Sequence, residues 1–265
     1  MRSSANMSNM ANMDPTHSGP ALAGRAVLVT GAARRIGAAM ARGFHAQGAD
    51  ICIHCHQSID EAEQLRDELN RRRAKSAAIV SADLLDVAAL PGIVSAALSA
   101  FGRLDVLINN ASTFYPTPLG TVSPAQWDDL MGTNLRAPFF LAQAAAAQLR
   151  ASKGAIVNMI DIHAQRPLPG HPVYSAAKAG LAMLTRSLAR ELGPEVRVNG
   201  IAPGPIMWPE AGMDAQLQKE IVAKTLLKRS GSPEDVVRAA LFFVKDAPYV
   251  TGQILAVDGG RSVGW

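Results

Sequence analysis

The sequence predicts an α/β protein with a doubly wound, mostly parallel sheet of about seven strands and helices on both faces. From Arg25 onward, short apolar runs alternate with longer amphipathic stretches, which is the pattern of repeated β-α units. Several of the longer stretches also begin with residues that start helices. We expect strands at 26–30, 50–54, 76–80, 106–109, 155–160, 197–201 and 254–257, with helices between them.

Length and composition predict one folded domain, residues 24–265, after a disordered tail, residues 1–23. The tail is rich in Ser, Asn, Met and Pro and lacks the apolar core of a signal peptide. The chain has 265 residues, of which 48% are apolar, enough for one sizeable core. No apolar stretch approaches the ~20 residues of a membrane span. With only two cysteines and no export signal, we expect a cytoplasmic protein that does not contact membranes.

The net charge argues against a nucleic-acid partner. It is only +4, and the basic residues are scattered except for the run Arg71-Arg72-Arg73. We interpret this run as a solvated helix end rather than a nucleic-acid patch.

Helix start signals follow several of the predicted strands. Ser58 to Glu61 and Ser123 to Gln126 have the pattern of capping boxes, in which the first and fourth residues exchange hydrogen bonds. Ser232 is followed by Pro233, which suits the first helical position. Residues 204–218 show weaker periodicity and are interpreted as a substrate loop.

A glycine-bearing turn from Thr30 to Gly37 follows the first predicted strand and leads into a helix. Gly31 allows a tight turn, and Gly37 allows the helix to approach the strand closely. The helix N-terminus offers N–H groups and a positive dipole end to a pyrophosphate. Any strand-to-helix turn can use glycine, but a place in the first β-α-β unit favours a Rossmann-type dinucleotide site. Arg34 and Arg35 stand beside this turn and can pair with a further phosphate.

The end of the second predicted strand favours NADPH over NADH. An NAD enzyme needs a carboxylate for the ribose 2′-hydroxyl about 20 residues after the turn. This chain has His54 to Ser58 there, with no acid before Asp60. We expect His56 and Ser58 to contact the cofactor, although helix capping alone explains Ser58 equally well.

The segment Cys52-Ile53-His54-Cys55-His56 also matches the pattern for covalent haem attachment and suggests zinc. In a strand, however, Cys52 and Cys55 point to opposite faces, and no second ligand pair is present. We therefore expect no metal.

Polar residues follow the next two strands as well. Asp83 is placed to meet the adenine, and Asn109-Asn110-Ala111-Ser112 follows the fourth strand. Each alone is explained as a turn residue. Ligands of such sheets bind beyond the carboxyl ends of the strands, so together with the glycine turn these residues indicate a cofactor site.

Tyr174 and Lys178 are four residues apart near the start of a predicted helix, 173–192, and so share one face. The Lys178 charge should lower the pKa of the Tyr174 phenol from about 10 towards neutrality, which suits proton transfer. Taken alone, the spacing is better explained by an amphipathic helix with an incidental Tyr and Lys.

Taken in order, the Asn110-Ala111 turn, Asn134, the Tyr174 and Lys178 pair and Pro203-Gly204 resemble the short-chain dehydrogenase/reductase family over residues 25–263. The resemblance implies that Tyr174 and Lys178 are catalytic, that Lys178 also holds the nicotinamide ribose, that Asn134 supports a water-linked proton path, and that the protein is a homotetramer. The implied cofactor contacts are Gly31, Arg34, Arg35, Ile36, Gly37, His56, Ser58, Asp83, Asn110, Ala111, Tyr174, Lys178, Pro203 and Gly204.

Asp161 departs from the general family, which usually has a serine after the fifth strand. No serine occurs between Lys153 and Ser175. A carboxylate would repel a carbonyl oxygen that develops negative charge, but it can accept hydrogen bonds from the amino and ring N–H groups of a pterin. The alternative is that Asp161 is only a loop residue or that the equivalent of the family serine lies nearby.

Arg35, the His54 and His56 pair, residues 110–116 and Asp161 together resemble the pteridine reductase branch of the family. The resemblance implies that Phe114 stacks the pterin against the nicotinamide, that Ser112 and Arg35 add polar contacts, and that Asp161, Tyr174 and Lys178 deliver protons. Phe114 as a packing residue is the alternative. Gln57 stands where the branch has a basic residue, which weakens the expected NADPH preference.

The expected reaction is hydride transfer from NADPH to the C=N carbon of a dihydropterin or dihydrofolate, with a proton to the adjacent nitrogen. One alternative is a carbonyl reductase for keto-acyl, sugar or steroid substrates, against which Asp161 argues. The other is an NADPH-sensing protein without turnover, against which Tyr174, Lys178 and Asn134 argue.

Overall fold

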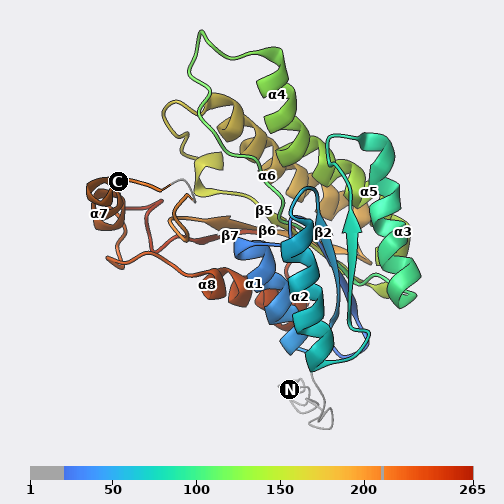
Figure 1. The fold of residues 1–265 in the computed structure, drawn as a ribbon. Helices are drawn as coiled ribbons and strands as arrows, with labels where there is room; N and C mark the ends of the chain where they lie inside the picture. Colours follow the sequence, from blue (N-terminus) through green and yellow to red (C-terminus); the bar gives the residue numbers. More distant parts are fainter. Residues whose placement is uncertain (1–20, 210–211, 265) are drawn as a thin grey trace, which may run out of the picture.

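A seven-stranded, all-parallel sheet in the order β3-β2-β1-β4-β5-β6-β7 forms the middle layer of the molecule (Figure 1). The computed structural model describes residues 21–209 and 212–264, so most of the predicted tail, residues 1–23, lies outside the described residues. Helices cover both faces of the sheet. The predicted fold class is therefore confirmed.

The strand positions follow the prediction closely. They are β1 (Ala26–Val29), β2 (Asp50–Cys55), β3 (Ala77–Ser81), β4 (Val106–Asn109), β5 (Ala155–Met159), β6 (Arg197–Pro203) and β7 (Ile254–Val257). The strand β6 runs two residues beyond its predicted end because its ladder with β7 continues to the pair Pro203 and Val257.

The helices are α1 (Arg35–Ala46), α2 (Ile59–Arg72), α3 (Leu90–Phe101), α4 (Pro124–Met131), α5 (Ala137–Ser152), α6 (Pro172–Leu192), α7 (Ala215–Ala223) and α8 (Pro233–Leu241). The described residues also contain four short helical segments: η1 (Val87–Ala89) and η3 (Ile162–Ala164) are 3-10 helices, and η2 (Gly132–Arg136) and η4 (Phe242–Asp246) are π-helical. No helix in the described part of the chain is long and apolar enough to cross a membrane.

Alternate residues of each strand enter different cores. Val27 and Val29 belong to the core that also contains residues of α1, α2 and α8, whereas Leu28 belongs to the core that contains residues of α3, α5 and α6. Cys52 lies in the second of these cores and Cys55 in the first, so the two thiols point to opposite faces as predicted.

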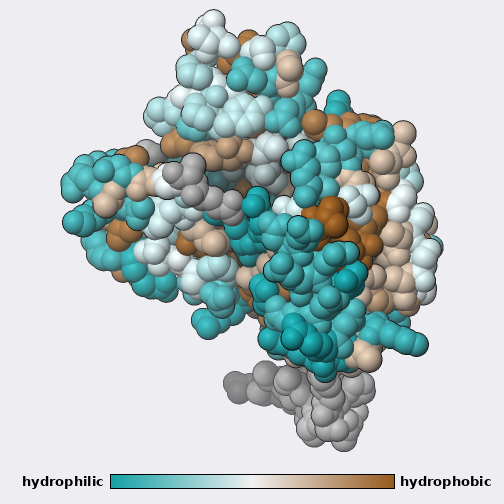
Figure 2. All heavy atoms as spheres, in the orientation of Figure 1, coloured by the Kyte–Doolittle hydropathy of each residue, from teal (hydrophilic) through white to brown (hydrophobic). Residues whose placement is uncertain are grey.

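The basic run Arg71-Arg72-Arg73 ends α2, which presents hydrophilic surface in Figure 2. Arg72 pairs with Glu68 at 2.9 Å, and Arg73 pairs with Asp50 at 3.0 Å. The interpretation of this run as a helix end is confirmed.

All three predicted helix starts are confirmed, since α2, α4 and α8 begin directly after Ser58, Ser123 and Ser232, but the capping box predicted at Ser58 is wrong. Ser123 and Gln126 form a capping box at α4, and Ser232 forms one with Asp235 at α8, where Pro233 is the first helical residue. Ser58 makes no capping bond through its side chain, because its ψ of 58° differs from the extended 155° and 160° of the other two serines. The expected 204–218 loop also ends early, since α7 begins at Ala215 and Asp214 caps it by accepting from Leu217 N.

Candidate active site

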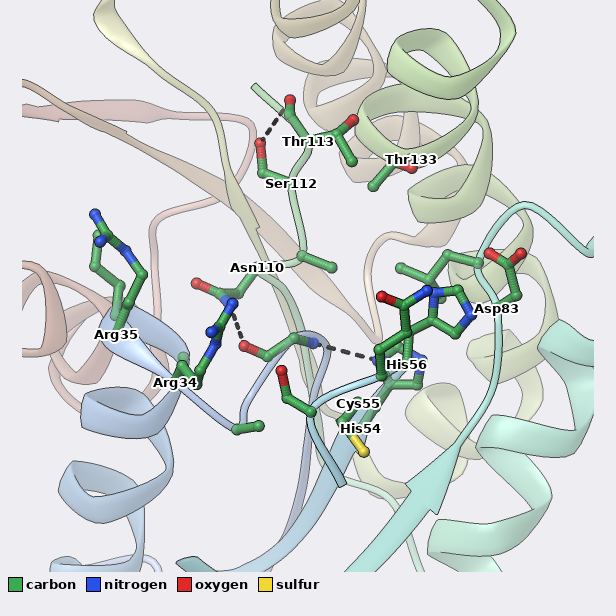
Figure 3. Close-up of a pocket in the computed structure, with 18 of the residues that line it drawn as sticks. Arg34, Arg35, His54, Cys55, His56, Asp83, Asn110, Ser112, Thr113 and Thr133 are labelled. Atoms are coloured by element: carbon green, nitrogen blue, oxygen red, sulfur yellow. Dashed lines mark hydrogen bonds between the residues drawn. The ribbon is translucent and has the colours of Figure 1, made fainter. Parts of the chain in front are cut away.

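The carboxyl ends of β1, β2, β3 and β4 surround a cavity of about 640 Å³. Its lining includes most of the predicted cofactor contacts, namely Gly31, Arg34, Arg35, Ile36, Gly37, His56, Ser58, Asp83, Asn110 and Ala111. Figure 3 shows His56 and Asp83 at one end of this cavity and Arg35 on the far side.

The glycine turn has the close packing that its sequence predicts. Gly31 has a φ of +60°, which favours glycine, and a Cβ on Gly37 would lie 2.1 Å from the Gly31 carbonyl oxygen. The Asn110 side chain donates to the carbonyls of Thr30 and Gly31 at 2.8 and 3.1 Å. The β4 end therefore holds the turn in place while the N-terminus of α1 faces the cavity.

Arg35 joins this turn to the segment after β6. Its backbone takes the left-handed φ of +53° that a glycine would adopt more easily, and its Nη2 donates to the Trp208 carbonyl at 3.0 Å. Arg34 lies 3.8 Å from Glu61 in an ion pair whose side chains are both partly exposed. Both residues line the cavity beside the glycine turn.

Asp161, Tyr174 and Lys178 come together between β5 and α6. Tyr174 Oη donates to Asp161 Oδ2 at 2.8 Å, and His163 N donates to Asp161 Oδ1 at 2.8 Å. Lys178 Nζ donates to the Met159 carbonyl at 2.9 Å and lies 5.7 Å from the Tyr174 ring centroid. The carboxylate is thus held against the phenol rather than turned into solvent.

The predicted lowering of the Tyr174 pKa is wrong. Burial, at 4% exposure, and then the Asp161 charge raise the pKa of Tyr174 well above its usual value, with only a small opposing effect from Ser112. Burial also lowers the pKa of Lys178 to about 8, against the opposite effect of Asp161. The spacing of Tyr174 and Lys178 reveals the nearby ammonium, but it reveals neither the Asp161 carboxylate nor the loss of solvent. Tyr174 is therefore a protonated phenol, suited to donate a proton.

Asn134 is fully buried in the π-helical segment η2. Its Nδ2 donates to the Thr113 and Leu130 carbonyls, both at 3.0 Å, and its Oδ1 accepts from Ser112 Oγ at 2.6 Å. Single π-helical turns occur often at functional sites. Here the turn brings Asn134 to Ser112, which in turn adjoins Tyr174.

Phe114 is half exposed and forms an edge-to-face pair with Tyr174 at a centroid distance of 4.8 Å. Four predicted cofactor contacts lie outside the 640 Å³ cavity: Tyr174 and Lys178 in the cluster with Asp161, and Pro203 and Gly204 at the end of β6. Gly204 lies so close to Asp258 that a Cβ would be 2.7 Å from the Asp258 Cβ.

A family profile described as enoyl-(acyl carrier protein) reductase matches residues 31–262. The chain belongs to the short-chain dehydrogenase/reductase family. Pteridine reductase 1 of Leishmania tarentolae is 38% identical, over 89% of this chain and 96% of that protein. The 3-oxoacyl-[acyl-carrier-protein] reductase FabG of Staphylococcus aureus strain Mu50 is 34% identical, over 89% and 97%. A blue fluorescent protein from a metagenomic library, solved in complex with NADPH, has a TM-score of 0.85 and 37% identity, over 90% and 98%.

As a short-chain dehydrogenase/reductase, the chain is an NAD(P)-dependent oxidoreductase. The two kinds of relative differ in substrate, one named for a pteridine and the other for a keto-acyl thioester. The residues around the Tyr174 phenol therefore bear on the choice between them.

Two residues of this reductase were missed as members of the site. The His171 ring stacks on Phe114 with centroids 4.7 Å apart and planes 9° apart, and its Nδ1 donates to the Pro169 carbonyl at 2.9 Å. A histidine just before Pro172, at the start of the helix that carries Tyr174, was the available signal. His54, which the sequence analysis named at the end of the second strand without assigning it a contact, accepts a hydrogen bond from the glycine turn directly.

Across residues 21–209 and 212–264, no group of three or more His, Cys, Asp or Glu side chains is placed to hold a metal ion.

Proposed function

We propose that this chain is an NADPH-dependent pteridine reductase, which converts a dihydropterin or dihydrofolate to its tetrahydro form. The observation that carries the proposal is the 2.8 Å hydrogen bond between Tyr174 and Asp161. It puts a carboxylate where most of the family has a neutral hydroxyl. Such a group suits a ring rich in N–H donors and opposes a carbonyl oxygen that gains negative charge.

The 640 Å³ cavity suits NADPH because of its glycine cradle and its basic end. The phosphates would be held by cationic and hydroxyl donors, namely Arg34, Arg35, His56 and Ser58. Residues 54–58 include no carboxylate that would repel a 2′-phosphate. Asp83 would meet the adenine. NADPH, when bound, supplies the hydride.

The protein residues supply orientation and the proton. Phe114 presents half its surface for a flat heterocycle to stack on. Asp161 would bind the amino and ring N–H groups of that heterocycle. Tyr174, kept protonated by burial and by Asp161, would donate its proton to the substrate nitrogen, and the Lys178 ammonium would stabilise the phenolate that is left.

The test is a substrate panel that follows NADPH and NADH oxidation side by side. We expect turnover of 7,8-dihydrobiopterin, dihydromonapterin or dihydrofolate, with NADPH preferred, and loss of turnover in Tyr174→Phe. Inactivity on all three refutes the proposal. Turnover of acetoacetyl thioesters instead would establish a carbonyl reductase, which the 34% identity to FabG favours as the second candidate. NADPH binding without turnover would indicate a sensor.

Asp161→Ser separates the two enzymatic candidates. In a pteridine reductase we expect it to lower kcat/KM for the pterin by roughly 10²-fold or more, because a binding and proton-positioning group is lost. In a carbonyl reductase the same change would leave or improve ketone turnover. Asp60→Asn, an exposed acid on α2, is the control.

We also propose that the protein works as a cytoplasmic homotetramer. Exposed apolar side chains on α5 and α6, such as Phe139 and Met183, offer surface for subunit contacts. Light scattering after size exclusion should give four times the 27.9 kDa of one chain. A monomer would refute this.

A further inference from the structure

His54 sits at the junction of three strand ends and is only 1% exposed. Gly31 N donates to its Nδ1 at 3.2 Å, and its Nε2 lies 3.1 Å from the Ala82 carbonyl oxygen. In Figure 3 a dashed line joins the backbone of the glycine turn to the His54 ring. The ring therefore links the phosphate turn after β1 to the residue before Asp83, after β3.

The two contacts fix the protonation of the ring. A backbone N–H only donates, so Nδ1 must carry a lone pair, and a carbonyl only accepts, so Nε2 must carry the hydrogen. A second proton would set an Nδ1–H against the Gly31 N–H. Burial lowers the pKa of His54 to about 4, with a further lowering by His56 and opposition from Asp83 and from the Ala82 hydrogen bond, so the ring stays neutral at ordinary pH.

The turn is held from two sides. Asn110 reaches it from β4, where its amide donates to the Thr30 and Gly31 carbonyls. His54 reaches it from β2 and accepts the Gly31 N–H, while the His54 carbonyl accepts from Ala32 N at 2.8 Å. Loss of the ring acceptor would leave the Gly31 N–H without this bond and free the turn to shift relative to Asp83.

We propose that His54 is a positioning residue of the NADPH site, which uses its two ring nitrogens to set the spacing between the phosphate turn and the adenine wall at Asp83. This inference rests on the proposed NADPH binding. It assigns His54 to the adenosine end of the site, away from Tyr174 and Lys178.

Two amide variants separate the two ring contacts. In His54→Asn the side-chain oxygen can take the place of Nδ1, so the Gly31 contact is kept and the Ala82 contact is lost. In His54→Gln the amide nitrogen can take the place of Nε2, so the Ala82 contact is kept and the Gly31 contact is lost. His54→Leu removes both. His45→Gln is the matched control, because His45 is also a buried histidine and bonds to Ser76 Oγ at 2.7 Å.

The measurements are NADPH titration by fluorescence and competition by adenosine 2′,5′-bisphosphate, which carries the adenine and 2′-phosphate but no nicotinamide. We expect His54→Gln to weaken both ligands about 10-fold, equivalent to about 1.4 kcal/mol. His54→Asn should weaken them less than His54→Gln, and His54→Leu more. In kinetics the KM for NADPH should rise much more than kcat falls.

Unchanged ligand affinity in His54→Gln would overturn the inference. So would equal losses in His54→Asn, His54→Gln and His45→Gln that follow their melting temperatures, because these would indicate a structural role only. A wild-type chain that binds neither NADPH nor the bisphosphate overturns the proposed cofactor as well, which distinguishes that failure from the first two.

Discussion

Asp161 acts on two neighbouring groups at once. Tyr174 and Lys178 are 4% and 2% exposed, so burial disfavours the charged form of each. The Asp161 charge raises the pKa of both side chains, and it therefore keeps the phenol neutral and the ammonium charged. A serine hydroxyl at this position would carry no charge and would do neither.

We expect Asp161→Asn to move the basic limb of the pH profile of kcat/KM to lower pH. Lys178 loses its proton as the pH rises through about 8, and removing a charge that raises its pKa lowers that value further. The measurement is kcat/KM for the pterin from pH 6 to 10 at saturating NADPH. The control Asp60→Asn should leave the basic limb in place. An unmoved basic limb in Asp161→Asn as well would contradict the assignment of this limb to Lys178.

His171 should affect substrate binding through Phe114. Because aromatic pairs contribute about 0.5–1.5 kcal/mol beyond burial, His171→Ala should raise the KM for the pterin by roughly 2- to 10-fold. His171→Phe keeps a stacked ring and should stay near the wild-type value, and the KM for NADPH should change in neither variant. If His171→Ala and His171→Phe raise the KM for the pterin equally in steady-state kinetics, the ring stack on Phe114 does not cause the change in KM.

The sequence could predict contacts between residues that are close together along the chain, but not contacts between distant segments. Tyr174 and Lys178 lie one helical turn apart, so their spacing was visible in the sequence. The stack of His171 on Phe114 joins a helix start to a loop after β4, and only the folded chain brings these together. The Tyr174 pKa likewise required burial and the Asp161 distance, neither of which a sequence pattern contains.

At the scale of helices and strands, the predictions were correct where the hydrogen bonds that define a helix end join residues only a few positions apart. The Ser123 and Gln126 box closes within one turn, whereas the Ser58 box failed because the chain enters α2 with a different backbone angle. The π-helical turn at Asn134 also went unpredicted, since no spacing rule marks it. It nevertheless sets where Asn134 meets Ser112.

The caps give a matched set of stability predictions. Ser123→Ala and Ser232→Ala should each lower the free energy of unfolding by about 1 kcal/mol, because each leaves a helix N–H without its acceptor. Ser58→Ala removes no capping bond and should change stability by less than ~0.5 kcal/mol. Urea unfolding measures these values. If Ser58→Ala loses as much free energy of unfolding as Ser123→Ala and Ser232→Ala, the Ser58 hydroxyl caps α2 in solution.

The whole sheet brings the site together from distant parts of the chain. Parallel strands place all of their carboxyl ends on one edge, so the glycine turn, Asp83, Asn110 and Asp161 meet there although they come from four different strands. Tertiary bonds across that edge, such as those of His54, then tie the stability of the fold to the geometry of the site.

This link predicts that the fold loses stability as the pH falls from about 6.5 towards 4. In the unfolded chain His54 should take up a proton near pH 6.5, but in the folded chain only near about 4. Between these two pH values the unfolded state binds more protons than the folded state. Each unit by which the pH falls therefore lowers the free energy of unfolding by up to about 1.4 kcal/mol through His54. Above about pH 6.5, His54 makes no such contribution. Urea unfolding at pH 7, 6 and 5 should show a shallower slope for His54→Asn, which cannot take up this proton. Carboxylates contribute equally to both proteins, so identical slopes would mean that His54 is already charged in the folded protein or is not buried there.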